Sequence, residues 1–293
     1  MKKLFAILSI ALISASLLFT GCSKDEDPVP PTITFKTDAG YVSANTSANY
    51  GDTLYFGITA KSNGTDNLVK FQLFANGVQL LDSTVNTATF TLDMFTVKTI
   101  LDKEVWKFVT TDIVGNSKSD SITITGNFGE INTYSSIKFG AQNNTTEKGF
   151  LSLSNSTSTS YTQDEAFDHQ ADIDLFCFYE NTATSANMMA LAAPGSNIKE
   201  IFTGATAPEF YATKNVTFFT KTTLTAAQFE AVQNDAVIRA SFDPNNKFKK
   251  AKLLTVGDVY AFKLQSGKYG LYKVTAVEGT EDGTLQIAVK IQK

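Results

Sequence analysis

The chain has 293 residues, of which 43% are hydrophobic, and a formal net charge of −4. This length exceeds one average domain and favours two, each with enough apolar residues for a core. A nucleic-acid partner is not expected, because the densest basic stretch, 247–252, is short and isolated. We interpret that stretch as a solvated turn or the edge of a sheet.

The first residues of the chain predict export and a lipid anchor. Two lysines precede an apolar run, 4–19, which is too short for a committed membrane span and typical of a secretory signal peptide. The residues before Cys22 resemble the lipobox of bacterial lipoproteins, in which the cysteine becomes the acylated first residue. The resemblance implies that residues 1–21 are removed and that Cys22 is lipidated.

The residues after Cys22 resemble a narrower signal. A Ser-Lys pair followed by Asp25, Glu26 and Asp27 is similar to the export signal of Bacteroidota surface lipoproteins. This resemblance implies a lipid-anchored protein on the outer face of the outer membrane; a periplasm-facing location is the alternative. The remainder of the linker, 22–31, is proline-rich and predicts an extended spacer.

Short strands are predicted along residues 32–126. Apolar and polar residues alternate in 54–60, as in a half-buried strand, and Asn76-Gly77 between two apolar runs predicts a tight hairpin. The predicted strands span 32–37, 53–60, 68–75, 78–82, 87–94, 104–111 and 118–125. Strands this short, separated by frequent turn signals, predict a β-sandwich.

One stretch of this predicted sandwich, 106–117, carries a family resemblance. It reads Trp-Lys-Phe-Val-Thr-Thr-Asp-Ile-Val-Gly-Asn-Ser and resembles the penultimate strand and following hairpin of bacterial immunoglobulin-like modules. The resemblance implies an Ig-like, fibronectin-like sandwich without the cysteine pair of antibody domains. We interpret Trp106 as a core residue, with a sugar platform as the alternative.

Glycines at 126 and 129 predict a short junction, after which residues 130–293 mix strands with short helices. Capping boxes at Thr162 and Thr225 predict the starts of two helices, and 197–203 has the pattern of one or two helical turns. The predicted strands of this part span 136–142, 149–154, 172–179, 188–192, 215–221, 258–264, 269–278 and 283–291.

These elements predict an α+β domain with an antiparallel sheet, so that the whole chain is mainly β. Phrases within 256–274 are similar to C-terminal domains of Bacteroidota lipoproteins. That resemblance implies no biochemical function.

No common catalytic motif occurs in the chain. It lacks Gly-x-Ser-x-Gly, His-Glu-x-x-His and a phosphate-binding loop, and its single histidine, His169, leaves few ways to build Ser-His or Cys-His catalysis. Cys177 lies in the apolar run 173–179 and is interpreted as a buried small residue. We expect a protein that is not an enzyme. A secreted hydrolase is the third candidate function, because paired carboxylates are recognised only in three dimensions.

The densest polar cluster contains the candidate metal ligands. Asp164 and Asp168 share one helix face, Asp172 follows one turn later, and Ca²⁺ would accept such oxygens. The glycine-bearing loop of a calcium-binding hand is missing, so a solvated helix with early acidic residues is the simpler interpretation. No cofactor is otherwise expected.

Aromatic residues in loops and in the last hairpin are the candidate ligand contacts. They are Tyr161, Phe210, Tyr211, Tyr269 and Tyr272. Flat rings on a rigid sheet suit sugars, although each of these rings could instead pack in a core.

Together these patterns predict a non-catalytic cell-surface lipoprotein. We expect the membrane to hold it through Cys22 and its C-terminal domain to bind an extracellular ligand, with a glycan captured as a nutrient as the first candidate. The alternative is an adhesion or envelope-assembly protein with a protein partner.

Overall fold

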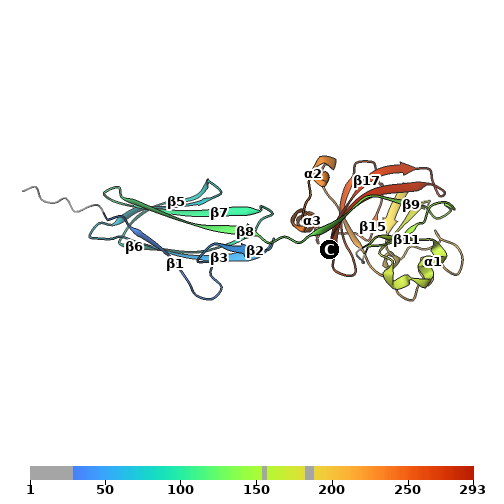
Figure 1. Ribbon diagram of the computed structural model, residues 1–293, viewed down its shortest axis with the longest axis horizontal. Helices are drawn as coiled ribbons and strands as arrows, with labels where there is room; N and C mark the ends of the chain where they lie inside the picture. The colour runs from blue at the N-terminus through green and yellow to red at the C-terminus, as the bar shows by residue number, and fades with distance from the viewer. Residues whose placement is uncertain (1–28, 154–156, 182–187) are drawn as a thin grey trace, which may run out of the picture.

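The computed structural model describes residues 29–153, 157–181 and 188–293. The predicted signal peptide, Cys22 and the acidic residues after it therefore lie outside the described residues. Figure 1 shows two groups of strands along the long axis of the molecule, joined by one connection. Described strands pair only within their own group, and almost all pairs are antiparallel, so the fold is mainly β. Within the described ranges no helix is long and apolar enough to cross a membrane.

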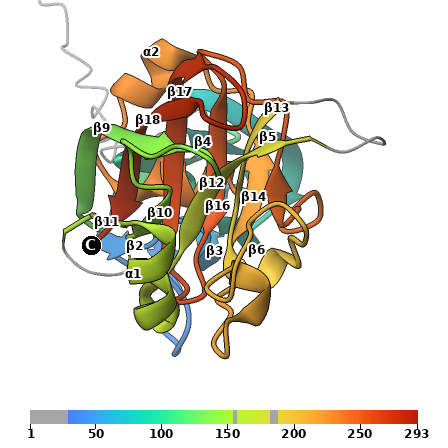
Figure 2. The same cartoon turned by 90° about the vertical axis from the view of Figure 1, so that its right-hand side faces the viewer.

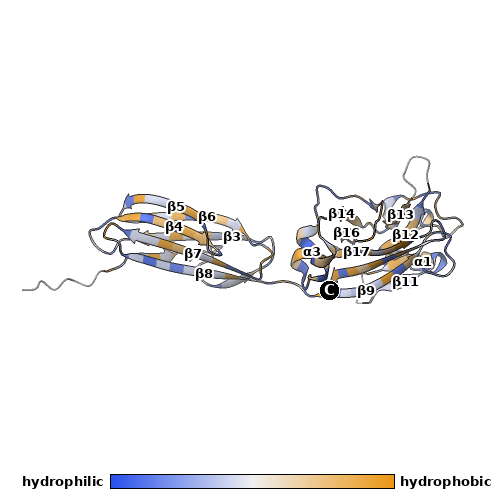
Figure 3. Cartoon of the chain, turned by 90° about the horizontal axis from the view of Figure 1, so that it is seen from above, coloured by the Kyte–Doolittle hydropathy of each residue, from blue (hydrophilic) through white to orange (hydrophobic). Residues whose placement is uncertain are grey.

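The N-terminal half is a β-sandwich. Its strands are β1 (Thr32–Phe35), β2 (Thr46–Ala48), β3 (Thr53–Lys61), β4 (Leu68–Ala75), β5 (Val78–Thr87), β6 (Thr89–Val97), β7 (Lys103–Asp112) and β8 (Ser117–Gly126). One sheet has the order β1-β3-β6 and the other β2-β8-β7-β4-β5. Buried and less buried residues alternate along much of β3 and β7, so every second side chain points between the sheets. Figure 3 colours the strands by hydropathy, and hydrophobic segments in orange recur along both groups of strands.

All seven predicted strands of this half are present, and the predicted hairpin is confirmed. Asn76 and Gly77 have φ of 50° and 82°, as a primed turn requires at both central positions. Trp106 is 6% exposed and its ring centroid lies 5.4 Å from that of Phe56, so it is a core residue. Strand β2 escaped prediction because three residues, Thr-Ser-Ala, carry no periodic pattern.

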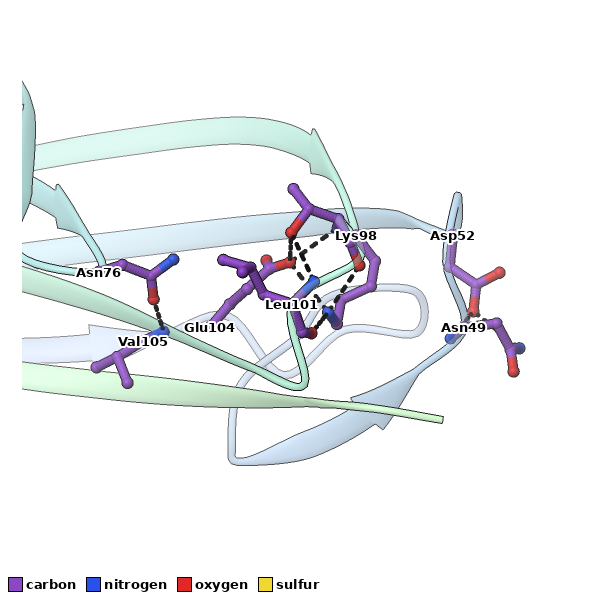
Figure 4. A network of polar contacts seen from close by, with 8 residues as sticks. Asn49, Asp52, Asn76, Lys98, Leu101, Glu104 and Val105 are labelled. Atoms are coloured by element: carbon purple, nitrogen blue, oxygen red, sulfur yellow. Dashed lines mark hydrogen bonds and ion pairs between the residues drawn. The ribbon is translucent and has the colours of Figure 1, made fainter. Parts of the chain in front are cut away.

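A buried ion pair lies at the junction end of this sandwich (Figure 4). Lys98 is fully buried, and its Nζ lies 3.0 Å from Oε1 of Glu104 and also donates to the carbonyl oxygens of Thr99 and Leu101. The same carboxylate oxygen accepts hydrogen bonds from the backbone N–H and the hydroxyl of Thr99. Both charges are thereby compensated inside the protein, as buried charges must be.

The C-terminal half has two five-stranded sheets. Its strands are β9 (Ile131–Gly140), β10 (Phe150–Ser152), β11 (Thr159–Tyr161), β12 (Leu175–Glu180), β13 (Met188–Ala192), β14 (Phe218–Lys221), β15 (Lys250–Ala251), β16 (Val259–Lys263), β17 (Tyr269–Glu278) and β18 (Thr284–Gln292). The sheet orders are β11-β10-β12-β13-β15 and β14-β16-β17-β18-β9. The sequence predicted one antiparallel sheet for this half, and the structure has two.

Helices cover the outer faces of these two sheets. The helical elements are α1 (Gln163–Asp168), η1 (Gln170–Asp172), η2 (Pro194–Ser196), η3 (Pro208–Phe210), α2 (Ala226–Glu230) and α3 (Asp235–Ser241). In the end-on view of Figure 2, α2 lies at the top and α1 at the bottom. Three apolar clusters result: one between the sheets, one under α1 and one under α2 and α3.

Both predicted capping boxes are confirmed. Thr162 and Thr225 each accept a hydrogen bond from the backbone N–H three residues on, and the side chains of Glu165 and Gln228 accept one from the backbone N–H of the cap residue. The prediction of helical turns at 197–203 is wrong, because Asn197 and Glu200 take left-handed conformations that interrupt any helix. Helix α3 was not predicted, although Asn234 caps its start.

Candidate functional site

Two of the five candidate aromatic contacts are buried. Tyr272 is fully buried and stacks on Tyr260 at 5.2 Å between the two sheets. Tyr211 is 3% exposed and packs edge-on against Phe167 at 5.9 Å. The prediction that these two tyrosines contact a ligand is therefore corrected: their ring faces are covered by the protein. Burial also raises the pKa of both hydroxyls.

The three remaining candidates lie in different places. Tyr161 is half-buried, packs on the cluster under α1 and lies tilted against His169 at 4.9 Å between ring centroids, so part of its ring is already covered. Phe210 is 60% exposed in η3, near the same cluster. Tyr269 begins β17 on the opposite sheet and is half-buried. The structure therefore does not assemble the predicted aromatics into one site.

The candidate metal ligands are not brought together either. Asp164 accepts a hydrogen bond from the hydroxyl of Thr206 at 2.8 Å, and Asp172 faces Nδ1 of His169 at 3.7 Å. Nowhere in the described ranges do three His, Cys, Asp or Glu residues form a group that could hold a metal. The suggested calcium site, with Asp168 as its third ligand, is accordingly corrected to a solvated helix.

Cys177 has the environment of a structural residue. Its side chain is fully buried, and Sγ lies 3.9 Å from Sδ of Met189. Burial raises the pKa of this thiol far above its usual range, so a reactive thiolate is disfavoured.

The basic stretch 247–252 is divided between two sites. Lys250 belongs to β15, an edge strand as predicted, and forms an ion pair with the buried Glu180, which Lys252 also approaches at 3.4 Å. Burial by itself raises the pKa of Glu180, but these lysines outweigh burial and lower it. Lys247 instead lies over the ring of Phe218.

A groove at the end of the sheet β14-β16-β17 combines aromatic and cationic side chains. Its main lining residues are Phe218, Phe242, Lys247, Lys263, Gln265 and Tyr269, and its volume is about 280 Å³. We call it the aromatic groove. Its volume is just below the usual range for ligand pockets and leaves room for one small ring-shaped group.

Strand register builds the floor of the aromatic groove. Phe218 pairs with Lys263 across β14 and β16, and Lys263 pairs with Tyr269 across β16 and β17. Directly opposed residues point to the same face, so the three side chains form a row across three strands. Phe242, just after α3, closes one side and meets Tyr269 edge-on at 5.4 Å.

Each lysine of the aromatic groove sits over an aromatic ring. The Nζ of Lys247 lies 4.7 Å from the ring centroid of Phe218, and the Nζ of Lys263 lies 4.8 Å from that of Tyr269. Gln265 uses its Oε1 to accept a hydrogen bond from the N–H of Val216 at 3.2 Å, which fixes the side of the groove. Of the sequence candidates only Tyr269 lies here. Phe218 and Lys263 were missed because only the strand register brings them to it.

Comparisons with known proteins do not identify the chain. No family model matches it, and no curated protein matches it. A DUF4466 family protein from Parabacteroides merdae is similar at 15% identity and a TM-score of 0.42, over 91% of this chain and 100% of that one. Fibronectin(III)-like modules of Clostridium thermocellum CbhA are similar at 11% identity and a TM-score of 0.22, over 32% of this chain and 96% of that one. Likenesses this distant carry no argument about the site.

Proposed function

We propose that this chain is a non-catalytic surface lipoprotein that binds an extracellular glycan in the aromatic groove. The observation that carries the proposal is the row of Phe218, Lys263 and Tyr269, in which rings and a hydrogen-bond donor share one rigid sheet. Sugars present apolar C–H faces and hydroxyl groups, which suit aromatic surfaces flanked by polar donors. Residues 32–126 would then act as a spacer between the membrane and the binding half.

Removing the flat ring of Tyr269 is the direct test of glycan binding. Tyr269→Leu keeps an apolar side chain against Phe242 but removes the stacking surface, so we expect roughly tenfold weaker binding, corresponding to about 1.4 kcal/mol. Binding is measured by titrating the purified mature chain with a panel of neutral and acidic polysaccharides.

The matched control is Phe210→Leu. It removes an exposed ring in η3, which lies on the side of the other C-terminal sheet. It is expected to leave affinity unchanged. If Phe210→Leu weakens binding and Tyr269→Leu does not, the site lies near η3 and the aromatic groove is the wrong assignment. If no polysaccharide binds the wild type, the glycan proposal fails.

The lipid anchor is tested at Cys22. Cys22→Ala removes the acylated side chain, so we expect the protein to leave the membrane fraction almost completely, as measured by fractionation and immunoblotting. Protease added to intact cells should degrade the wild type. Protection of the wild type in intact cells would show that it faces the periplasm instead.

A protein partner is the second candidate function. The outer face of the sheet β1-β3-β6 exposes Tyr55 by 48% and Phe95 by 69%, directly opposite each other with ring centroids 6.1 Å apart. Exposed apolar surface of this kind is typical of interaction sites when it is contiguous. Stoichiometric binding of one envelope protein, together with no binding to any glycan, would favour an adhesion or assembly role.

A further inference from the structure

The aromatic groove presents two ammonium groups that have no carboxylate partner. Neither Lys247 nor Lys263 forms an ion pair within the part of the chain that the structure describes, and no Asp or Glu is among the described residues that line the groove. Other lysines of this half differ: Lys221 pairs with Asp258 at 2.9 Å, and Lys273 pairs with Glu230. The groove is thus a local positive site on a chain whose net charge is −4.

The nearest acidic residue along the chain does not neutralise these lysines. Asp243 stands between the lining residues Phe242 and Pro244, but its carboxylate accepts hydrogen bonds from the backbone N–H of Asn245, at 2.8 Å, and from the side chain of Asn246. These hydrogen bonds lower the pKa of Asp243 and hold it in its own turn.

The rings of the groove hold the ammonium groups in place. An ammonium group over a ring face is attracted by the ring quadrupole, and Lys249 adds a second cation at 5.9 Å from Phe218. A neutral sugar that stacks on the same faces of Phe218 and Tyr269 competes with these ammonium groups. An anionic group instead gains binding free energy, because it makes charge-assisted contacts with cations that the rings already hold in position.

We propose that the aromatic groove selects acidic glycans, with the carboxylate or sulfate of one sugar unit placed between Lys247 and Lys263. This inference rests on the proposed function and adds the class of its ligand. Charge complementarity carries it: the groove offers two cations, Lys247 and Lys263, and no competing carboxylate among its described lining residues. Uronic acids and sulfated sugars share the required chemistry, so the experiment separates them.

The experiment compares matched polymers on the purified mature chain. Polygalacturonate is compared with its fully methyl-esterified form, which tests the carboxylate. Chondroitin sulfate is compared with unsulfated chondroitin, which tests the sulfate. We expect the more highly charged member of one pair to bind at least about tenfold more tightly, and this preference to decrease with added salt, since screening weakens exposed charge pairs.

The decisive variant is Lys247→Gln with Lys263→Gln, which keeps the length of both side chains. It is expected to abolish the tenfold preference, because the anionic polymer loses both cations and binds at least about tenfold more weakly. The matched control, Lys107→Gln with Lys118→Gln, removes the same charge from exposed positions of β7 and β8 and should retain the preference.

Four results would overturn this inference. Equal binding of charged and neutral polymers would overturn acid selectivity while glycan binding itself stood. A preference unchanged in the double variant would place the anion elsewhere. Polyacrylate is an anionic polymer without sugar rings. If it binds as tightly as the acidic glycans, charge attraction alone explains the binding. Failure of every polymer to bind would instead remove the proposed function together with the inference.

Discussion

Lys98→Met is expected to destabilise the N-terminal half by about 3–5 kcal/mol, because it removes one partner of a buried ion pair. Methionine retains an apolar stem of similar length, so the main change is the loss of the ammonium group. Glu104 would then remain buried without its opposing charge. The free energy of unfolding, measured by denaturant titration, reports the effect.

Two controls separate charge from packing in this experiment. Lys103→Met changes an exposed lysine of the neighbouring strand and should alter stability by less than about 0.5 kcal/mol. The double variant Lys98→Met with Glu104→Leu should recover much of the loss, since an apolar pair removes both buried charges. If Lys98→Met is as stable as the wild type, the ion pair contributes little.

The contribution of this pair also depends on pH in a defined direction. Burial by itself raises the pKa of Glu104, but hydrogen bonds from Thr99 and Lys98 outweigh burial and lower it. A carboxyl whose pKa is lower in the folded state stabilises the fold above its unfolded pKa and loses that contribution as the pH falls through the folded value. The difference between wild type and Lys98→Met should therefore shrink in acid.

Phe176→Ala is expected to destabilise the C-terminal half by about 3–5 kcal/mol. The side chain is fully buried under α1, and its ring centroid lies 5.2 Å from that of Phe202 and 5.4 Å from that of Phe150. Truncation leaves a cavity that these rings cannot fill without leaving their own contacts. The matched control is Phe210→Ala, which truncates an exposed ring and should have little effect.

The two destabilising variants together test the predicted domain boundaries, 32–126 and 130–293. If each half unfolds as its own cooperative unit, Lys98→Met shifts one transition and Phe176→Ala shifts the other. Described strands pair only within each half, which supports this expectation. One shared transition that both variants move equally would show that the halves unfold together.

Local signals predicted much of the fold. Asn76-Gly77 specifies its turn through backbone conformation, and Thr162 with Glu165 specifies a helix start through hydrogen bonds within four residues. Such signals depend on neighbours in the chain and can be read without the rest of the protein. The failure at 197–203 shows the limit of such signals, because the left-handed backbone of Asn197 ends η2 and that of Glu200 interrupts any following helix.

The candidate site could be predicted only in part, as Tyr269 and Tyr272 illustrate. Both lie on β17, three residues apart and therefore on opposite faces, and nothing in the sequence says which face is covered. The fold packs Tyr272 between two sheets and leaves Tyr269 at the rim of a groove.

The sequence by itself determined the mainly β class and most individual strands, because these depend on residues close together in the chain, and it carries the lipobox resemblance on which the proposed anchor rests. Only the tertiary structure decided which rings are exposed and which cations stand beside them. Phe218, Lys263 and Tyr269 become neighbours through the register of three strands. That register is set by hydrogen bonds and packing between distant segments, which no local pattern encodes.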